Sequence, residues 1–320
     1  LIVVQSTTLC NLDCSYCLLP ERKTREVMNL EAAKSIFNNA IRSGFFGSNT
    51  VVCWHLGEPL LLPIKYYAEL IFFIRNLLKS SELEVKFVIQ TNGTRIDEAW
   101  CQFVKDNQIS LGVSLDGPAL FHNLFRRRRG GGHSHDRVEA GVHLLNRLGI
   151  DFHVICVLSD DAISNPHIVY QYFKELGVRN LCFNIQESEG TEVSELLMRP
   201  GIESRIESFF GEICDIVMAD SDPIWIREIS KMLSSIIYGS EYSAPSQEMT
   251  FGKAHTILWN GDLIPYSPGF ATLPSMLRRN YVLGNLSDGP VDLSAVPISY
   301  AALMREIDEL RSKWQSLCEY

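Results

Sequence analysis

Six short apolar segments alternate with segments of helical periodicity along the first two-thirds of the chain, and this alternation limits the possible folds more than any other feature. The predicted strands are residues 1–7, 50–55, 84–90, 109–115, 151–158 and 180–186. The helices predicted between them are residues 30–43, 64–80, 97–107, 134–148 and 165–176. Strands this continuously apolar are typical of parallel sheets covered on both faces. The pattern therefore predicts an α/β fold, either a flat doubly wound sheet or an incomplete barrel.

Each predicted strand runs directly into a polar turn. The turns have the sequences TTLCNLDC, HLGEP, QTNG, SLDGP, LSDD and NIQESEG. In parallel α/β folds the active site is built from the loops that follow the carboxyl ends of the strands. We therefore expect an enzyme whose chemistry is collected at one rim of the sheet.

The pattern changes after residue 200. Residues 254–266 indicate a β-hairpin with Asn260-Gly261 at its turn, which is a strong local signal. The surrounding predictions are one or two helices over 201–240, a strand and turn over 281–289, and a closing helix over 297–317. We expect three parts, namely a sheet domain at 1–200, a helical connector at 201–250 and a small α+β C-terminal extension at 251–320.

Composition restricts the partners and the compartment. The formal net charge of the 320 residues is −9, which argues against nucleic acid as the main partner. One basic run, Arg126 to Arg129, is either a solvated loop or an anion or peptide contact beside the active site. No apolar run approaches the roughly 20 residues of a membrane span. Nothing resembles a signal peptide, although a chain that begins inside a strand is expected to have lost its native N-terminus.

The cysteines are used in two ways. Six of the nine are scattered singly, as small buried hydrophobes are, which favours a reducing compartment and the cytoplasm. The other three, Cys10, Cys14 and Cys17, follow the first strand with the spacing CxxxCxxC. A zinc site would need a fourth ligand, and no Cys or His stands at a suitable local spacing. Three thiolates on one loop suit one 4Fe–4S cluster with an open iron, with zinc as the alternative.

The cysteine motif and the turn Leu56-Gly57-Glu58-Pro59 together resemble the radical S-adenosylmethionine (SAM) superfamily. The resemblance implies a partial (β/α)6 barrel and a 5′-deoxyadenosyl radical, made from SAM, that abstracts a hydrogen atom from the substrate. The family usually has Gly-Gly-Glu-Pro where this chain has Leu56 first. The implied SAM contacts are Tyr16 at the adenine, Gly57 and Glu58 at the amino group, Ser114 and Asp116 at the ribose or carboxylate, and Arg126 at the carboxylate.

The segments QTNGT, VSLDGP and His122–Arg126 are similar to radical SAM peptide maturases with a SPASM-type C-terminal extension. Such extensions hold auxiliary clusters through cysteines, whereas here only Cys318 follows Cys214, and Tyr266 stands where a cysteine is expected. The segments NGDLIPYSP, YVLGNL and FNIQESEG resemble maturases that form cyclophanes in glycine-rich precursor peptides. That resemblance implies a bond between an aromatic ring carbon and an aliphatic side-chain carbon.

Forming that bond removes one electron and one proton after the hydrogen abstraction. The active-site cluster would take the electron and a rim carboxylate the proton; Glu187 is the first candidate and Asp262 the second. The expected partners are a ribosomal precursor peptide, glycine-rich with aromatic residues, and a flavodoxin- or ferredoxin-type reductant. The alternatives are an anaerobic sulfatase maturase, a thioether-forming peptide maturase, or a non-catalytic metal-binding or scaffold protein that keeps the fold.

Overall fold

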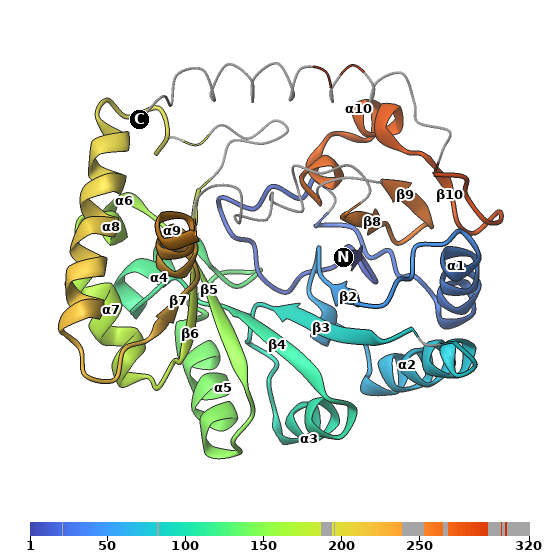
Figure 1. The fold of residues 1–320 in the computed structure, drawn as a ribbon, viewed down its shortest axis with the longest axis horizontal. Helices are drawn as coiled ribbons and strands as arrows, with labels where there is room; N and C mark the ends of the chain where they lie inside the picture. Colours follow the sequence, from blue (N-terminus) through green and yellow to red (C-terminus); the bar gives the residue numbers. More distant parts are fainter. Residues whose placement is uncertain are drawn as a thin grey trace.

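The computed structural model describes residues 1–20, 22–81, 83–186, 194, 196–238, 253–264, 268–293, 302 and 305. Within these residues the strands form one ten-stranded sheet in the order β10-β9-β8-β1-β2-β3-β4-β5-β6-β7. The run from β8 through β1 to β7 is parallel throughout. It curves into an open barrel with helices along its outer face (Figure 1). The predicted partial barrel is confirmed, and the flat doubly wound alternative is wrong.

The predicted strands and helices of the barrel are also confirmed. The strands are β1 (Ile2–Val4), β2 (Thr50–Trp54), β3 (Val85–Thr91), β4 (Ile109–Ser114), β5 (Phe152–Leu158) and β6 (Asn180–Ile185). The helices are α1 (Leu30–Arg42), α2 (Ile64–Leu78), α3 (Glu98–Asn107), α5 (His135–Arg147) and α7 (Pro166–Glu175). The α-helices and strands between residues 1 and 240 that the sequence analysis missed are α4 (Ala119–Phe125), α6 (Asp160–Ile163) and β7 (Trp225–Ile226).

The main core lies between the sheet and its outer helices. Trp54 of β2 stacks on Phe87 of β3 with ring centroids 5.4 Å apart, and it packs edge-on against Tyr67 of α2 at 5.1 Å. All three side chains are buried. Because successive strand residues point to opposite faces, His55 after β2 lies on the other face, toward the barrel interior. The apolar face of the sheet thus packs against the outer helices, and polar side chains point into the barrel interior.

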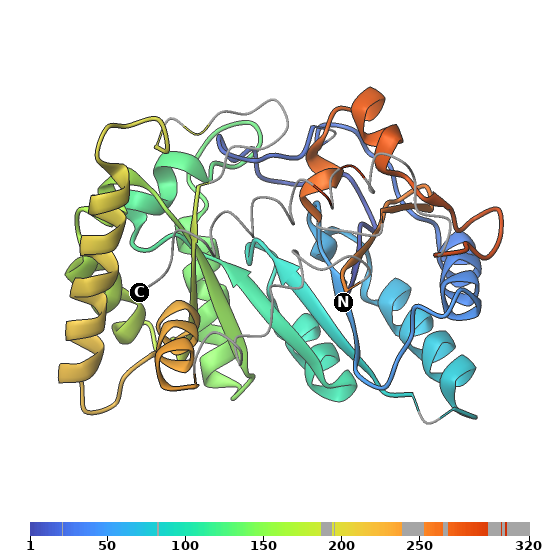
Figure 2. The ribbon, with the colours of Figure 1, turned by 45° about the horizontal axis from the view of Figure 1, so that its top comes forward.

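The C-terminal region extends this sheet. Helices α8 (Ile202–Ala219) and α9 (Arg227–Tyr238) lead to the predicted hairpin, which is β8 (His255–Ile257) and β9 (Asp262–Ile264). The short helix α10 (Ser275–Arg278) and β10 (Gly284–Asn285) follow. Strand β8 pairs with β1 in parallel, so the hairpin lies directly beside the first barrel strand (Figure 2). The three-part division stays a prediction, and the closing helix at 297–317 falls outside the described residues except for residues 302 and 305.

Among the described helices, none is both long and apolar enough to cross a bilayer.

Candidate active site

The three cysteines lie on the loop that follows β1. This loop is held by backbone hydrogen bonds to a distant segment: Asp13 N donates to Arg127 O at 2.8 Å, and Ser15 N donates to Phe125 O at 3.0 Å. Cys14 is buried, whereas Cys10 and Cys17 are partly exposed. The loop is therefore fixed in place by residues more than a hundred positions away in the sequence.

The surroundings of the thiols fit a metal cluster. Burial raises the pKa of Cys10 to about 11 and that of Cys14 to about 12, so both thiols stay protonated unless a cation compensates the thiolate charge. The Cys10 sulfur accepts hydrogen bonds from Leu12 N at 3.4 Å and Asn92 Nδ2 at 3.7 Å. Donors aimed at sulfur stabilise a metal-bound thiolate.

The spacing of the ligands bears on the zinc alternative. In the part of the chain that the structure describes, no three Cys, His, Asp or Glu side chains converge to hold a single metal ion. A zinc ion needs four ligands at about 2.0–2.3 Å from one atom, whereas each thiolate of a 4Fe–4S cluster binds a different iron. Three thiols on one loop, with no fourth Cys or His at a suitable local spacing, suit the cluster better than a zinc ion.

The turn after β2 adopts an unusual backbone conformation. Gly57 has φ +120°, and a Cβ built on it would lie 2.2 Å from Thr7 O, so only glycine fits against the cysteine loop. Leu56 has φ +63°, in the left-handed region that disfavours a side chain. Its side chain is buried in a small core with Val3 of β1 and the hairpin residues Leu258 and Ile264. The leucine that departs from the family pattern is thus strained, and it ties the turn to the hairpin.

Glu58 is completely buried, and neutral donors surround its carboxylate. Oε1 accepts from Leu60 N at 2.9 Å and Thr91 Oγ1 at 2.7 Å, and Oε2 accepts from Asn92 N at 2.7 Å. Burial raises the pKa of Glu58 above its usual value, against the effect of these hydrogen bonds. Glu58 therefore joins the ends of β2 and β3. Its contact with the SAM amino group stays a prediction.

Asn92 is a residue of this site to which the sequence analysis assigned no role. Its side-chain amide donates to Asn11 Oδ1 at 2.8 Å and to the Cys10 sulfur, while its backbone N–H is bound to Glu58. It connects the turn after β3 to the cysteine loop across 82 sequence positions. The only signal in the sequence was the position of Asn92 in the polar turn QTNG.

Three predicted SAM contacts meet after β4. Asp116 Oδ2 accepts from the Tyr16 hydroxyl at 2.5 Å and from Arg126 Nε at 2.8 Å, and Oδ1 accepts from Val157 N at 3.0 Å. The Arg126 guanidinium also lies over the Tyr16 ring, 5.3 Å from its centroid. The side chains of Asp116 and Arg126 are only 3% and 9% exposed. Asp116 is thus saturated by protein donors, and it orients Tyr16 and Arg126 rather than facing solvent.

A neutral histidine supports this ion pair. His122 Nδ1 accepts from Asp116 N at 3.3 Å, which places the ring proton on Nε2, 2.9 Å from Ser134 Oγ. Ser134 Oγ in turn donates to Arg126 O at 2.5 Å. Burial lowers the pKa of His122 to about 3. His122 was noticed only as part of a resembling segment, and the structure shows that it fixes the backbone on both sides of the ion pair.

The barrel interior near Arg126 presents unpaired polar groups. Arg126 uses Nε on Asp116, and its two Nη groups have no protein acceptor among the described residues. His55 Nδ1 is buried without a partner in the same described part, and burial together with the Arg126 charge lowers the pKa of His55 to about 4. A free guanidinium end and a neutral imidazole are suitable partners for the carboxylate and amino groups of an amino acid. This donor set fits the methionine end of SAM.

Ser114 faces the same interior. Its hydroxyl accepts from Gln90 Nε2 at 3.1 Å. Gly112, two residues earlier, leaves room for neighbouring side chains, because a Cβ there would lie 1.9 Å from Gln90 Oε1 and 2.6 Å from His153 Nε2. The interior wall of β3, β4 and β5 is therefore polar, with space created by a glycine.

The two candidate proton acceptors are placed differently. Glu187 falls outside the described residues, so its role stays a prediction. Asp262 lies in β9, where its carboxylate accepts from Asn260 Nδ2 and from Asn285 Nδ2, each at 2.8 Å. Asp262 therefore stabilises the hairpin turn and its contact with β10.

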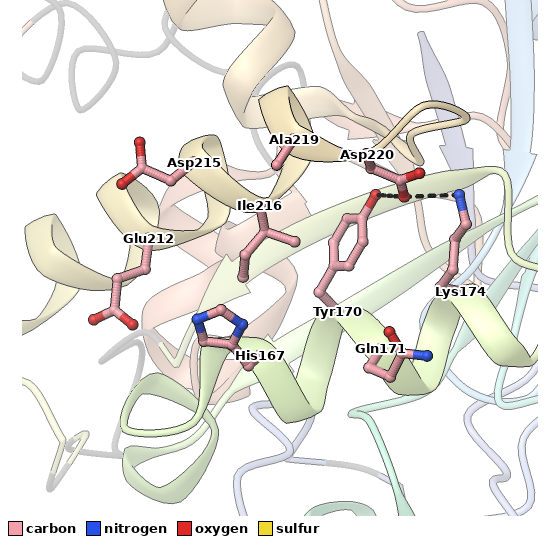
Figure 3. Close-up of a pocket in the computed structure, with 9 residues that line it drawn as sticks. All are labelled: His167, Tyr170, Gln171, Lys174, Glu212, Asp215, Ile216, Ala219 and Asp220. Carbon is pink, nitrogen blue, oxygen red and sulfur yellow. Dashed lines mark hydrogen bonds and ion pairs between the residues drawn. The ribbon is translucent and has the colours of Figure 1, made fainter.

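A groove of about 620 Å³ lies elsewhere, between α7 and α8 on the outside of the barrel (Figure 3). At one end of it Asp220 accepts from the Tyr170 hydroxyl and from Lys174 Nζ, each at 2.7 Å. The Lys174 ammonium lowers the pKa of Asp220 to about 2. These contacts join two outer helices, whereas the cysteine loop follows β1. The groove is therefore separate from the candidate active site.

Comparison with known proteins agrees with this geometry. Residues 4–165 match the sequence model described as the radical SAM superfamily. Over its whole length the chain is 25% identical to an uncharacterized protein of Synechocystis sp., 81% of which is covered. It is 30% identical over 189 residues to a serine-type anaerobic sulfatase-maturating enzyme of Bacteroides thetaiotaomicron, covering 55% of this chain and 43% of that enzyme. The match thus spans less than half the length of that maturating enzyme.

Solved structures show the same fold. Native anSMEcpe with bound AdoMet aligns with a TM-score of 0.75 at 23% identity, covering 90% of this chain and 78% of that chain. Streptococcus suis SuiB bound to precursor peptide SuiA aligns with a TM-score of 0.59 at 15% identity, covering 90% and 62%. At these identities the likeness establishes the α/β partial barrel and nothing more specific.

Proposed function

Because this chain belongs to the radical SAM superfamily, we propose that it is a peptide maturase that forms a cyclophane crosslink in a ribosomally made precursor peptide. The new bond joins an aromatic ring carbon to an aliphatic side-chain carbon. When bound, one 4Fe–4S cluster and SAM supply the 5′-deoxyadenosyl radical that abstracts a hydrogen atom. The observation that carries SAM binding is the free guanidinium end of Arg126, held by Asp116 beside the cysteine loop, and the crosslink rests on the hairpin sequence NGDLIPYSP.

The chain's own residues bind and orient the reactants. Cys10, Cys14 and Cys17 hold the cluster, and Arg126 holds the SAM carboxylate. Tyr16, fixed by its hydrogen bond to Asp116, packs against the adenine. The polar interior wall between β3 and β5 faces the peptide. One hydrogen of the peptide leaves with 5′-deoxyadenosine. The second leaves as a proton, for which Glu187 is the proposed acceptor, and as an electron, which the active-site cluster would accept.

Two observations support a peptide substrate and the cyclophane chemistry. The structural relatives include SuiB with its precursor peptide and anSMEcpe with a bound peptide. The C-terminal hairpin carries the sequence NGDLIP of the resembling cyclophane maturases, and after Cys214 the chain has only Cys318. The sulfatase-maturase and thioether alternatives would call for several auxiliary-cluster cysteines around the hairpin, and between residues 215 and 317 there are none.

The test is a product assay. With a reductant, SAM and a cysteine-free precursor peptide that contains an aromatic residue, the reconstituted enzyme should yield 5′-deoxyadenosine and a peptide lighter by two hydrogens. Tandem mass spectrometry should find no backbone fragments inside the joined stretch. A reaction restricted to cysteine-containing peptides would instead indicate a thioether maturase, and an aldehyde product would indicate sulfatase-maturase chemistry. Either result would overturn the cyclophane proposal and leave the radical SAM assignment intact.

A further inference from the structure

A strongly basic surface lies directly against the cysteine loop. Arg127, Arg128 and Arg129 are exposed. Their backbone pairs with the loop residues between Cys10 and Cys14: Arg129 N donates to Asn11 O at 2.9 Å, and Leu12 forms an antiparallel bridge with Arg128. The arginines and the cluster ligands are therefore parts of one rigid patch.

The tip of this basic segment projects into solvent. Arg127 forms an antiparallel bridge with His133, which closes a short loop. The three glycines between them, residues 130–132, are exposed, and nothing lies within 4 Å of a Cβ built on any of them. The loop is thus open to solvent, while Arg127 and Arg129 each also donate to a backbone carbonyl of this chain, those of Asn123 and Arg22.

Neighbouring charges reinforce the positive potential. Arg22 and the exposed Lys23 lie in the segment just after Cys17, and Arg22 also binds the Cys17 carbonyl at 2.7 Å. Among the described residues 10–29, the acidic groups are Glu26, which is exposed, and Asp13, which is paired with Arg22 at 3.0 Å; Glu21 lies outside the described residues. The patch is net basic in a chain whose net charge is −9.

We infer that this patch docks the protein that reduces the enzyme, a small acidic electron carrier of the flavodoxin type. The inference rests on the proposed function only in requiring a cluster on the cysteine loop. In the encounter the carrier loses one electron and the cluster gains it, and no bond between the two proteins forms or breaks. Because the arginine segment pairs with the backbone between Cys10 and Cys14, a partner seated on the arginines would be close to the electron acceptor.

The physical chemistry of such encounters matches the patch. Electron-transfer complexes are small and transient, and complementary charge speeds their formation more than it tightens them. Exposed charges are screened strongly by salt, so binding to this patch should weaken as ionic strength rises. Apolar anchors are not needed for a complex that must dissociate after each transfer.

The test measures carrier binding directly. Purified oxidised flavodoxin is titrated calorimetrically, without oxygen, into the reconstituted wild-type enzyme, the R127E/R128E variant and the control K79E/K105E. Lys79 and Lys105 are exposed residues next to the C-termini of α2 and α3, at the opposite end of the barrel, so the control makes the same charge change. SAM cleavage driven by dithionite and the iron content are measured in parallel, because neither depends on the carrier.

We expect R127E/R128E to weaken flavodoxin binding about tenfold or more at low salt, and the difference to vanish near ~0.5 M salt. Dithionite-driven SAM cleavage and iron content should equal those of the wild type, and K79E/K105E should bind normally. Unchanged flavodoxin affinity in R127E/R128E overturns the inference. So does a loss of precursor-peptide binding with normal flavodoxin binding, which would assign the patch to the substrate. If the double reversal lowers iron content, R127Q/R128Q should still weaken flavodoxin binding, by a smaller factor.

Discussion

Two buried carboxylates flank the cysteine loop, and they are satisfied in different ways. Glu58, at the ends of β2 and β3, accepts hydrogen bonds from neutral donors only. Asp116, after β4, shares a buried ion pair with Arg126. Neutral donors hold a carboxylate without supplying a countercharge or a further binding group, whereas the ion pair holds a guanidinium whose remaining donors stay available. The β2–β3 side, formed by Glu58 and its donors Leu60, Thr91 and Asn92, thus fixes the rim, and we call it the frame. The β4 side presents binding groups.

The largest expected effect is a difference between the two carboxylates in how much the protein's free energy of unfolding falls when each is removed. Asp116→Ala leaves the Arg126 charge buried without its partner, which should lower the free energy of unfolding by about 3–5 kcal/mol. Glu58→Ala leaves neutral donors unpaired, and we expect a loss of about 1–3 kcal/mol. Urea unfolding of the two variants measures both values. Glu31→Ala, on the exposed surface of α1, is the control and should change stability by less than about 0.5 kcal/mol. An equal or larger loss in Glu58→Ala would remove the distinction.

The barrel strands could be predicted from sequence because their signal is local. Each strand is a continuous apolar run that ends in a polar turn, so both the strands and the rim were visible. β7 was missed because it has only two residues, one of which is the exposed Trp225. α4 was missed because its seven residues are too short for a clear helical period.

The frame and the ion pair depend on contacts that sequence spacing does not reveal. Asn92 reaches the Cys10 sulfur across 82 positions, and Tyr16 reaches Asp116 across 100. The sequence identified Tyr16, Asp116 and Arg126 as separate SAM contacts, and it had no means of showing that they bind one another. The pairing of β8 with β1 is likewise a long-range contact, which the local hairpin signal could not foretell.

The two sides of the rim should also differ in how their contribution to stability depends on pH. The pKa of His122, which supports the ion pair, is lowered to about 3 by burial, so the stability from its neutral form is complete above pH 6.5 and is lost as pH falls toward 3. The pKa of Glu58 is raised, so its contribution is complete below about pH 4.5 and is lost as pH rises through its folded pKa. The two sides of the rim should therefore respond to acid in opposite directions.

The measurement is the unfolding free energy of wild type minus that of His122→Asn, whose side-chain oxygen can still accept from Asp116 N, followed from pH 7 down to pH 4. The stability of the wild type relative to His122→Asn should decrease as the pH falls, with a slope of at most about 1.4 kcal/mol per pH unit. The matching difference with Glu58→Gln should move in favour of the wild type over the acidic end of the range. If the two differences run in the same direction, the electrostatic contrast between the sides is wrong.

The smallest expected effect concerns the strained leucine at the edge of the frame. Leu56→Ala removes the packing against the hairpin but keeps a side chain at φ +63°, whereas Leu56→Gly removes the packing and also the strain. A left-handed conformation costs an L-residue about 1–2 kcal/mol, and the greater freedom of unfolded glycine costs about 0.4–1 kcal/mol. We therefore expect the Gly variant to be more stable than the Ala variant by about 0.5–1 kcal/mol.

This order is the reverse of the usual one, which makes a small difference decisive. Leu70, buried in the interior of α2, provides the control, because there Gly should be about 1 kcal/mol less stable than Ala. Thermal or urea unfolding of the four variants gives both comparisons under identical conditions. If Leu56→Gly is the less stable of its pair, as at Leu70, then Leu56 carries no backbone strain. Having leucine in place of glycine at this turn would then not lower the free energy of unfolding through backbone strain, and the packing of Leu56 on the hairpin would stabilise the protein without an opposing term.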